Sequence, residues 1–341
     1  MNIINDIVEK RNNILNGNIN SFPYPFAKLN QHLPGFTMGS YIIITANTKV
    51  GKTQIADYMF MLYPLFLLYN NRNNSTANKY NFAIECISLE LSALAKSYTI
   101  YSHFISNYFI KLTNNVNKKV TIEDLKSISQ PLSDDVLNEL STGKLKEFFD
   151  YIKPYYNIVD DKYTTTSIIN YIHTLALKYG RFEGTKWIAN DPNKYILISI
   201  DHISLLLSDK LNTNIFDSIG TLSKEIVKLK KLYYTFVFIV IQQQSAAAEN
   251  IQSIQFRSGE PTLDNLGENK STGRDADLVF GLYSPYRHKI LVHENLNISE
   301  YKDNYRSLLI LADRHYGKIG YFNRLYFDGS FNNFKELNIN G

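Results

Sequence analysis

The chain has 341 residues, of which 44% are hydrophobic, and a formal net charge of +4. This length allows one large α/β domain with additions or two domains, and the apolar content is enough for a substantial core. The single cysteine, Cys86, excludes an internal disulfide and fits a reducing compartment. The mild positive charge permits nucleic-acid contact without requiring it, because a surplus of this size also serves ordinary solubility.

The sequence offers no targeting or membrane signal. Its first residues lack the basic start and apolar run of a signal peptide. The longest apolar run, residues 58–69, is too short to cross a bilayer and contains Pro64. We therefore expect no membrane contact and a cytoplasmic location.

Apolar residues at roughly helical spacing mark the start of the chain. Residues 1–20 carry a partial apolar stripe with charged residues between its members. A segment this short cannot bury the stripe alone, so it must pack on its own domain or on a neighbouring subunit. We expect residues 1–25 to form an N-terminal arm and residues 26–341 to form the main domain.

A phosphate-binding loop follows the first predicted strand. Residues 41–45 are an apolar, β-branched run typical of a buried strand, and the pattern A-x-x-x-x-G-K-T comes directly after it, with alanine where glycine is usual. Backbone N–H groups of such a loop converge on phosphate, the lysine reaches the β- and γ-phosphates, and the threonine hydroxyl completes a Mg²⁺ shell. The predicted nucleotide-binding residues are Ala46, Asn47, Thr48, Lys49, Val50, Gly51, Lys52, Thr53 and Gln54.

Two further predicted strands each lead to an acidic residue. Residues 82–88 form an apolar run, and Glu90 follows it as a candidate general base for activating water. The alternative role of Glu90 is to complement a helix dipole. Residues 195–200 form another apolar run, which Asp201 closes, and this carboxylate is placed to hold Mg²⁺ through its water shell.

The middle of the chain is expected to cover the sheet with helices. Residues 93–190 alternate helical patterns with polar loops, a helix start is predicted at residues 133–135, and Trp187 is interpreted as a packing residue. A later amphipathic helix spans residues 219–233. Its lysines are interpreted as a solvated face: Lys224, Lys228, Lys230 and Lys231.

Residues 236–241 form a fourth apolar run, which ends in three glutamines, and a glutamine at this place can hydrogen-bond a γ-phosphate. Four buried strands separated by helical stretches predict an α/β fold with a mostly parallel sheet and helices on both faces. A polar loop follows at residues 259–270, and residues 278–283 and 308–312 are predicted strands. Arg314, in a glycine-bearing turn, is either a surface residue or a finger that reaches a neighbour's triphosphate.

This ordered set of motifs resembles one family, the DnaB-like (superfamily 4) replicative helicases with a RecA-like core, including the bacteriophage members. The resemblance covers about residues 26–335. The matching motifs are residues 46–53, the S-L-E-L-S element at 88–92, the I-D-H-I segment at 200–203, Gln243, and the stretch from Pro261-Thr262-Leu263 to Asp275-Ala276-Asp277-Leu278-Val279.

The resemblance implies a ring-forming, ATP- and Mg²⁺-dependent motor on single-stranded DNA, expected to be a homo-hexamer with a primase or helicase loader as a partner. Catalysis would fall to Lys52, Glu90, Gln243 and Arg314, with Arg314 as the arginine finger. Pore loops lined by Lys210 and by Glu268, Asn269 and Lys270 would grip DNA, and residues 1–20 resemble the linker helix that docks on the adjacent protomer. A viral member would act in the host cytoplasm.

Three positions depart from the family pattern: Gly267 stands where arginine is usual, Ala312 replaces a lysine, and Lys270 stands where glycine is typical. Two other classes of function stay open. One is a RecA-like recombinase or regulatory ATPase that does not unwind DNA, and the other is a non-enzymatic ring that binds ATP structurally. Strand displacement on forked DNA distinguishes the first from a helicase, and an ATPase assay distinguishes the second.

Overall fold

The computed structural model describes residues 3–15, 21–73, 81–209, 214–245, 259–267 and 269–337. Within these ranges, one nine-stranded sheet organises the molecule in the order β13-β12-β11-β8-β1-β7-β6-β2-β3. The strands are β1 (Tyr41–Ala46), β2 (Phe82–Ser88), β3 (Tyr156–Val159), β6 (Tyr195–Asp201), β7 (Phe236–Gln243), β8 (Leu278–Tyr283), β11 (Tyr305–Asp313), β12 (Phe322–Asp328) and β13 (Asn333–Glu336).

The sheet has a parallel part and an antiparallel extension. Strands β8, β1, β7, β6, β2 and β3 all run the same way, and β11, β12 and β13 add to the β8 edge in antiparallel fashion. Two small hairpins lie outside the sheet, β4 (Gly180–Glu183) with β5 (Lys186–Ala189) and β9 (Val292–His293) with β10 (Leu296–Asn297). The predicted α/β class with a mostly parallel sheet is confirmed.

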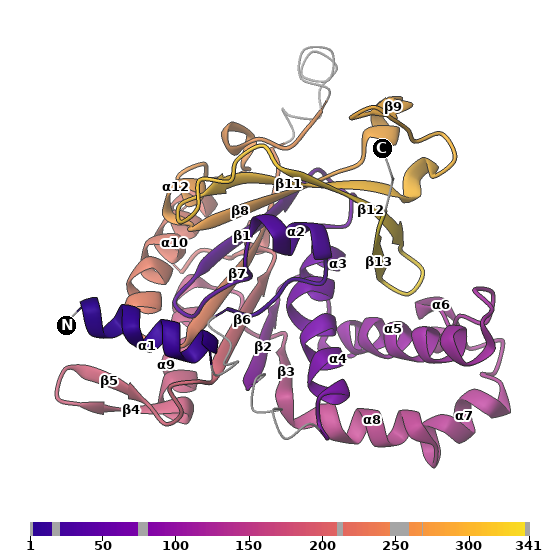
Figure 1. Ribbon diagram of the computed structural model, residues 1–341, viewed down its shortest axis with the longest axis horizontal. Helices are drawn as coiled ribbons and strands as arrows, with labels where there is room; N and C mark the ends of the chain where they lie inside the picture. Colours follow the sequence, from indigo (N-terminus) through magenta and orange to yellow (C-terminus); the bar gives the residue numbers. More distant parts are fainter. Residues whose placement is uncertain are drawn as a thin grey trace.

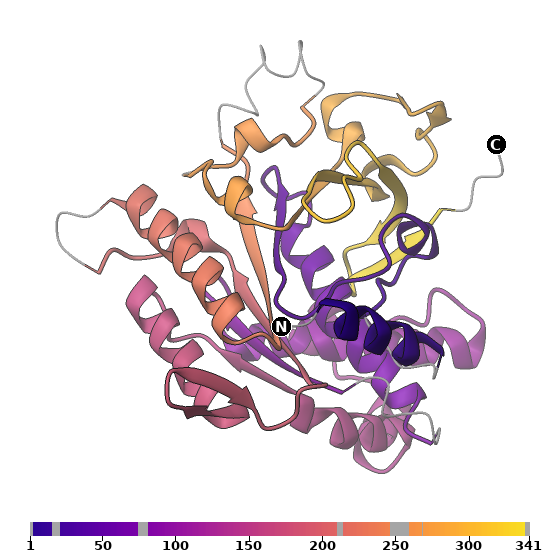
Figure 2. The same ribbon diagram turned by 60° about the vertical axis from the view of Figure 1, so that its left-hand side comes forward.

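Helices cover both faces of the parallel part, as Figure 1 shows. Helices α3, α4, α5 and α8 pack on one face, and α9 and α10 pack on the other, where Figure 2 shows them side by side. Within the described residues the helices are α1 (Ile3–Leu15), α2 (Ala27–His32), α3 (Lys52–Asp57), α4 (Tyr63–Asn70), α5 (Ala93–Thr113), α6 (Ile122–Lys126), α7 (Asp134–Ser141), α8 (Lys144–Ile152), α9 (Thr165–Tyr179), α10 (Ile215–Leu232) and α12 (Thr272–Asp275). No described helix is both long and apolar enough to cross a membrane.

Side chains that alternate along each central strand fill two separate cores. In β1, Ile42 and Ile44 join the core beneath α3, α4 and α5, whereas Ile43 joins the core beneath α9 and α10. Every residue of β1 and β2 is buried. A strand covered on both faces is therefore mostly apolar, which explains why these strands were recognisable as apolar runs. Burial of each large apolar side chain of this kind contributes about 1.5–3 kcal/mol to the free energy of folding.

The six strands predicted from apolar runs are all present. The apolar run after the phosphate-binding loop is helical: α3 passes through a π-helical segment, Tyr58–Leu62, into α4. Helix α7 follows Ser133, in agreement with the predicted start. Trp187 is buried, and its indole N–H donates to the carbonyl of Ala176 at 3.0 Å, so its packing role is confirmed.

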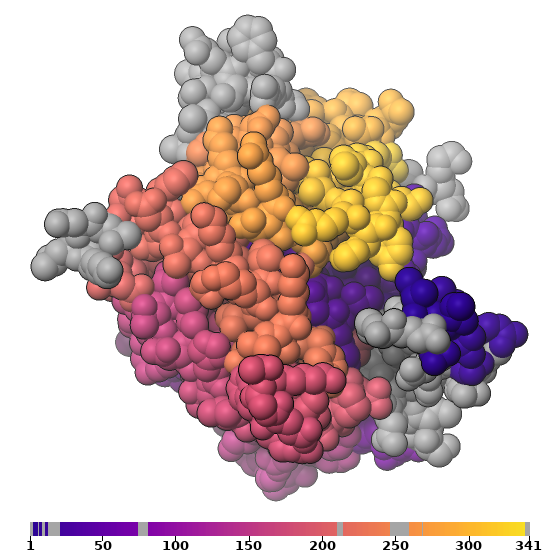
Figure 3. All heavy atoms as spheres, turned by 90° about the vertical axis from the view of Figure 1, so that its left-hand side faces the viewer, coloured from indigo at the N-terminus to yellow at the C-terminus, as the bar shows by residue number. Residues whose placement is uncertain are grey.

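Two features of the core differ from what the sequence suggested. Phe22 and Tyr24, in the segment assigned to the N-terminal arm, are buried in the main core, and the boundary at 25/26 stays a prediction. Lys230 does not belong to a solvated face, because its ammonium is buried and paired with Asp277. Helix α1, by contrast, exposes Ile3, Ile4 and neighbouring apolar side chains, and Figure 3 shows it in indigo at the edge of the molecule.

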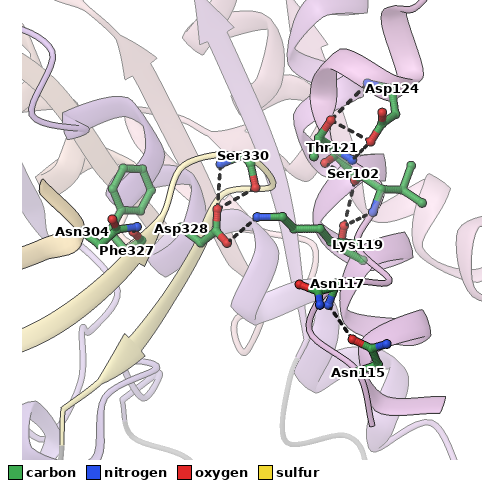
Figure 4. Close-up of polar contacts among 12 residues, drawn as sticks. Ser102, Asn115, Asn117, Lys119, Thr121, Asp124, Asn304, Phe327, Asp328 and Ser330 are labelled. Atoms are coloured by element: carbon green, nitrogen blue, oxygen red, sulfur yellow. Dashed lines mark hydrogen bonds and ion pairs between the residues drawn. The ribbon is translucent and has the colours of Figure 1, made fainter. Parts of the chain in front are cut away.

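The turn between β12 and β13 fastens the antiparallel extension to α5 and the segment after it. Lys119 contacts Asp328 at 3.0 Å, and the same carboxylate accepts hydrogen bonds from the N–H and hydroxyl of Ser330, as Figure 4 shows. The N–H of Ile122 donates to the carbonyl of Ser330. The ion pair joins residues that are 209 positions apart in the sequence.

A buried histidine completes this junction. His103 of α5 places Nδ1 3.0 Å from the carbonyl oxygen of Asn332. Burial lowers the pKa of His103 from 6.5 to about 4, against the raising effect of backbone contacts at Asn332 and Phe331. The folded protein therefore keeps this imidazole neutral at pH values where the unfolded chain protonates it.

We predict that the junction weakens as the pH falls. Between pH 6.5 and pH 4 only the unfolded chain takes up a proton at His103, so the folded state loses about 2 kcal/mol of stability between pH 7 and pH 5 from this group. Thermal or urea unfolding at several pH values measures the loss. The His103→Gln variant should show a shallower dependence on pH, and equal slopes in the two proteins would disprove the assignment.

Candidate nucleotide-binding and catalytic site

The carboxyl ends of four parallel strands bring the predicted site residues to one edge of the sheet. Ala46 of β1 pairs with Gln243 of β7, and Ser88 of β2 pairs with Asp201 of β6. Since β6 and β7 are themselves neighbours, the two pairs lie along the same edge. This is the edge at which open parallel sheets bind ligands.

The phosphate-binding loop has the backbone geometry that its sequence predicts. Gly51 adopts a φ of +109°, a conformation that side-chain-bearing residues rarely take, and α3 begins at the next residue. The Arg306 guanidinium lies buried beneath the loop and donates through Nε to the carbonyl of Val50 at 2.7 Å. Burial lowers the pKa of Arg306 to about 10, which leaves it charged at neutral pH. This cation therefore anchors the loop from below.

The residues expected to hold Mg²⁺ are in direct contact. The hydroxyl of Thr53 donates to Oδ1 of Asp201 at 2.9 Å. No group of three His, Cys, Asp or Glu side chains within the described ranges forms a dedicated metal cage. A hydroxyl beside one carboxylate suits an ion that takes most of its ligands from phosphate and water, as Mg²⁺ does beside nucleotides. The donor set therefore fits Mg²⁺ delivered with a nucleotide.

Glu90 lies beside this contact, in a position open to water. The N–H of Leu89 donates to the carbonyl of Asp201 at 2.6 Å, which fixes the end of β2 against the end of β6. The Glu90 side chain is 47% exposed, and its Oε2 lies 3.7 Å from Nε2 of His202. A carboxylate that solvent reaches at this edge is suitably placed to accept a proton from an attacking water.

Gln243 connects the phosphate-binding loop to β7. Its amide donates to the hydroxyl of Thr48 at 2.8 Å. The adjacent glutamines, Gln242 and Gln244, point to the opposite face of the sheet from Gln243 and hold the following loop. Gln242 donates to the carbonyl of Asn269 at 3.1 Å, and Gln244 donates to the carbonyl of Thr262 at 3.2 Å. The three glutamines therefore join the nucleotide side of the sheet to the loop expected to bind DNA.

The structure describes two of the four predicted DNA-binding residues. Lys210 and Glu268 lie outside the described residues. Asn269 is 3% exposed, and its amide donates to the carbonyl of Phe216 at 2.9 Å, so its side chain braces the loop against α10. Lys270 is exposed. Among the described residues of this set, only Lys270 presents a side chain to solvent.

Arg314 lies at the opposite edge of the sheet from the phosphate-binding loop of its own chain. Its guanidinium is half-exposed and lies 3.6 Å from Asp277, whose carboxylate also accepts from the N–H of Tyr41 at 2.8 Å. Tyr41 begins β1 and Ala46 ends it, which separates the two edges by about 17 Å of strand. Arg314 is therefore out of reach of its own nucleotide site.

Sequence reasoning missed two buried charged residues at the centre of the site. Lys96 of α5 lies 2.9 Å from Asp201 and 2.9 Å from Asp57 of α3. Burial raises the pKa of Asp201, but Lys96 and the Thr53 hydrogen bond outweigh it and hold the pKa below its usual value. Burial raises the pKa of Asp57 to about 6. The sequence carried one signal for this cluster, because Asp57 is a single acidic residue in the apolar run after Thr53.

Comparison with protein families identifies the family to which the chain belongs. The family described as "DnaB-like helicase C terminal domain" matches residues 22–336. The chain belongs to this family. The matched region begins at Phe22, where the buried core also begins.

Solved helicase structures share the architecture of this DnaB-like domain. One of them, the ATPase domain of a phage helicase, is 20% identical with a TM-score of 0.67, and the match covers 98% of this chain and 99% of that one. A second structure, "The Structure Of A DnaB-Like Replicative Helicase And Its Interactions With Primase", is 20% identical with a TM-score of 0.66, and the match covers 97% of this chain and 66% of that one. No curated protein sequence matches the chain.

Family membership settles the class of activity. The chain is an ATP-hydrolysing enzyme and a replicative DNA helicase of the DnaB type with a RecA-like fold, as the resemblance predicted. Neither the match nor the fold favours a recombinase or a non-enzymatic ring. The roles of individual residues at the site remain predictions.

We predict separate effects for two variants of this DnaB-like site. Lys52→Ala should lose both nucleotide affinity and hydrolysis, because it removes the charge that meets the phosphates. Glu90→Gln should lower kcat by about 100-fold to 10,000-fold while nucleotide affinity stays within a few-fold, because only proton transfer is lost. Fluorescent-nucleotide binding and phosphate release measure the two quantities. Glu123→Gln, an exposed acid on α6, is the control, and equal hydrolysis by Glu90→Gln and the control would remove Glu90 from catalysis.

Proposed function

We propose that the domain works as a homo-hexameric ring that translocates on single-stranded DNA and completes each ATPase site across a subunit interface. The observation that carries this proposal is the position of Arg314. It lies at one edge of the sheet, half-exposed, while Lys52 and Asp201 lie at the other edge. Copies arranged head to tail would present Arg314 of one subunit to the nucleotide of the next.

Within one subunit, each residue of the site has a proposed role. The loop N–H groups and Lys52 hold the phosphates of ATP, and Thr53 with Asp201 holds Mg²⁺, which when bound neutralises charge on the β- and γ-phosphates. Glu90 accepts the proton of the attacking water. Arg314 from the neighbour stabilises the charge that develops in the transition state.

The glutamines at the end of β7 provide the proposed coupling to DNA. Gln243 contacts Thr48 in the phosphate-binding loop, so loss of the γ-phosphate shifts the end of this strand. Gln242 and Gln244 bond the backbone of residues 262–269, so the same shift reaches the loop that carries Lys270. Phosphate contacts from Lys270 and from the second predicted loop at Lys210 then grip the strand.

The exposed apolar side chains of α1 have a proposed partner in the adjacent protomer. Ile3, Ile4, Ile7 and Val8 are each about half exposed or more, and burial against a second copy would remove them from water. A primase or a helicase loader is the proposed further partner, by analogy with the DnaB-like helicase whose title names its interactions with primase.

Strand displacement on forked DNA tests the motor as a whole. We expect ATP-dependent unwinding, stimulation of ATP hydrolysis by single-stranded DNA, and a particle of six subunits by mass measurement with ATP and DNA. Hydrolysis without unwinding under these conditions would favour a recombinase or regulatory ATPase instead.

We predict that Arg314 acts in trans. Arg314→Ala alone and Glu90→Gln alone should each lose hydrolysis by about 100-fold or more, on the order of the effect of removing an arginine finger. Mixed subunits should regain activity, since some interfaces then combine an intact Glu90 with an intact Arg314. Steady-state ATPase rates across mixing ratios measure the recovery. Lys318→Ala, an exposed cation in the same turn, should keep full activity, and mixtures that never exceed the single variants would exclude the trans role.

We predict that Lys270 contacts DNA phosphate. Lys270→Ala should weaken binding of single-stranded DNA about equally for all sequences and lower the salt dependence of the affinity by about one charge. Fluorescence anisotropy at several salt concentrations gives the slope. Lys224→Ala, an exposed lysine on α10, is the matched control. An unchanged slope in Lys270→Ala would place the DNA elsewhere.

A further inference from the structure

A buried lysine occupies the inner side of the predicted metal site. Lys96 is fully buried, and its ammonium lies 2.9 Å from Oδ2 of Asp201 and 2.9 Å from Oδ1 of Asp57. The other oxygen of Asp201, Oδ1, accepts from Thr53. The two carboxylate oxygens of Asp201 therefore have separate partners, one facing the nucleotide loop and the other facing the core.

The three charged groups come from three elements that pack together at this point. Asp57 lies four residues after Thr53 in the helical run that starts at α3, so both side chains share the helix face that meets β6. Lys96 comes from the first turn of α5, and Asp201 ends β6. Burying charges is costly unless they are paired. Here one ammonium is shared by two carboxylates: it hydrogen-bonds Asp201 and forms an ion pair with Asp57.

The position held by the ammonium is one that a divalent cation would otherwise favour. Oxygens of two carboxylates, Oδ2 of Asp201 and Oδ1 of Asp57, converge there, and oxygen ligands of this kind are those that Mg²⁺ prefers. With the ammonium in place, only Oδ1 of Asp201 and the Thr53 hydroxyl face the nucleotide loop. Two such ligands are too few to hold Mg²⁺ without phosphate oxygens.

We propose that Lys96 is a positioning residue that serves as a resident cation, keeping Asp201 oriented while preventing divalent metal from binding before the nucleotide. This inference rests on the proposed metal roles of Thr53 and Asp201. In this proposal Lys96 sets the order in which metal and nucleotide bind: the site stays free of divalent metal until ATP binds, and the metal enters together with ATP. A purely structural ion pair would affect folding stability but would not govern metal binding.

Binding of Mn²⁺, a spectroscopic substitute for Mg²⁺, tests the proposal without any reading of enzyme activity. Electron paramagnetic resonance of free Mn²⁺ is followed as protein is added without nucleotide. Without nucleotide, the wild-type chain should bind Mn²⁺ only weakly at this site. Lys96→Met should gain one site, because Asp57 and Asp201 are then uncompensated, with affinity at least about ten-fold above that of the wild type.

A matched pair of variants keeps the test valid if Lys96→Met alone does not fold. Asp57→Asn leaves Lys96 paired with Asp201 and should bind no Mn²⁺. Asp57→Asn combined with Lys96→Met restores the wild-type net charge and frees Oδ2 of Asp201, so it should bind Mn²⁺ more tightly than Asp57→Asn. Equal Mn²⁺ affinity in this pair, or a tight site in the wild type without nucleotide, would overturn the proposal.

A separate arm distinguishes this inference from the metal assignment on which it rests. With a non-hydrolysable ATP analogue, the wild type should bind one Mn²⁺, and Thr53→Ala should lose that affinity. If Thr53→Ala binds Mn²⁺ and analogue as well as the wild type does, the proposed metal ligands are wrong. If it loses the metal but removal of Lys96 changes nothing, only the role of Lys96 fails.

Discussion

Asp201 is the residue through which the parts of the site are held together. One carboxylate oxygen accepts from Thr53 at the start of α3, the other is paired with Lys96 of α5, and the carbonyl accepts from Leu89 at the end of β2. These contacts fix the phosphate-binding loop, the strand end before Glu90 and the helix beneath them relative to one another. Because the carboxylate is fully buried, each contact is strong, and loss of any one leaves a charge or donor unsatisfied.

The direction of the strands explains why Arg314 lies far from the phosphate-binding loop of its own chain. Parallel strands place Ala46, Gln243 and Asp201 at one edge. Strand β11 is antiparallel to β8, so its end delivers Arg314 to the other edge, beside Asp277. The antiparallel extension thus places Arg314 at the edge of the sheet away from the phosphate-binding loop. The proposed head-to-tail assembly would bring these two edges of neighbouring subunits together.

The sequence was most informative where structure depends on local residues. The six strands were recognisable because a strand buried on both faces is mostly apolar, and the phosphate-binding loop was recognisable from its local sequence pattern. Strand β12 was missed because it alternates between buried and half-exposed residues, and β3 because it is short and lies at an edge. Lys96 and the buried side chain of Asn269 could not be predicted, since whether a polar residue is buried depends on elements far away in the sequence.

The alternation of side chains along β7 gives a physical reason for the proposed coupling between the nucleotide and the loop that carries Lys270. Successive residues of a strand point to opposite faces, so Gln243 reaches Thr48 while Gln242 and Gln244 reach the backbone of the following loop. The end of β7 cannot move relative to the phosphate-binding loop without also moving relative to the following loop, because its glutamine amides are bonded to both. Asn269 extends this connection to Phe216 near the start of α10. A change sensed at the phosphate-binding loop therefore has a continuous hydrogen-bonded route to the base of the loop that carries Lys270.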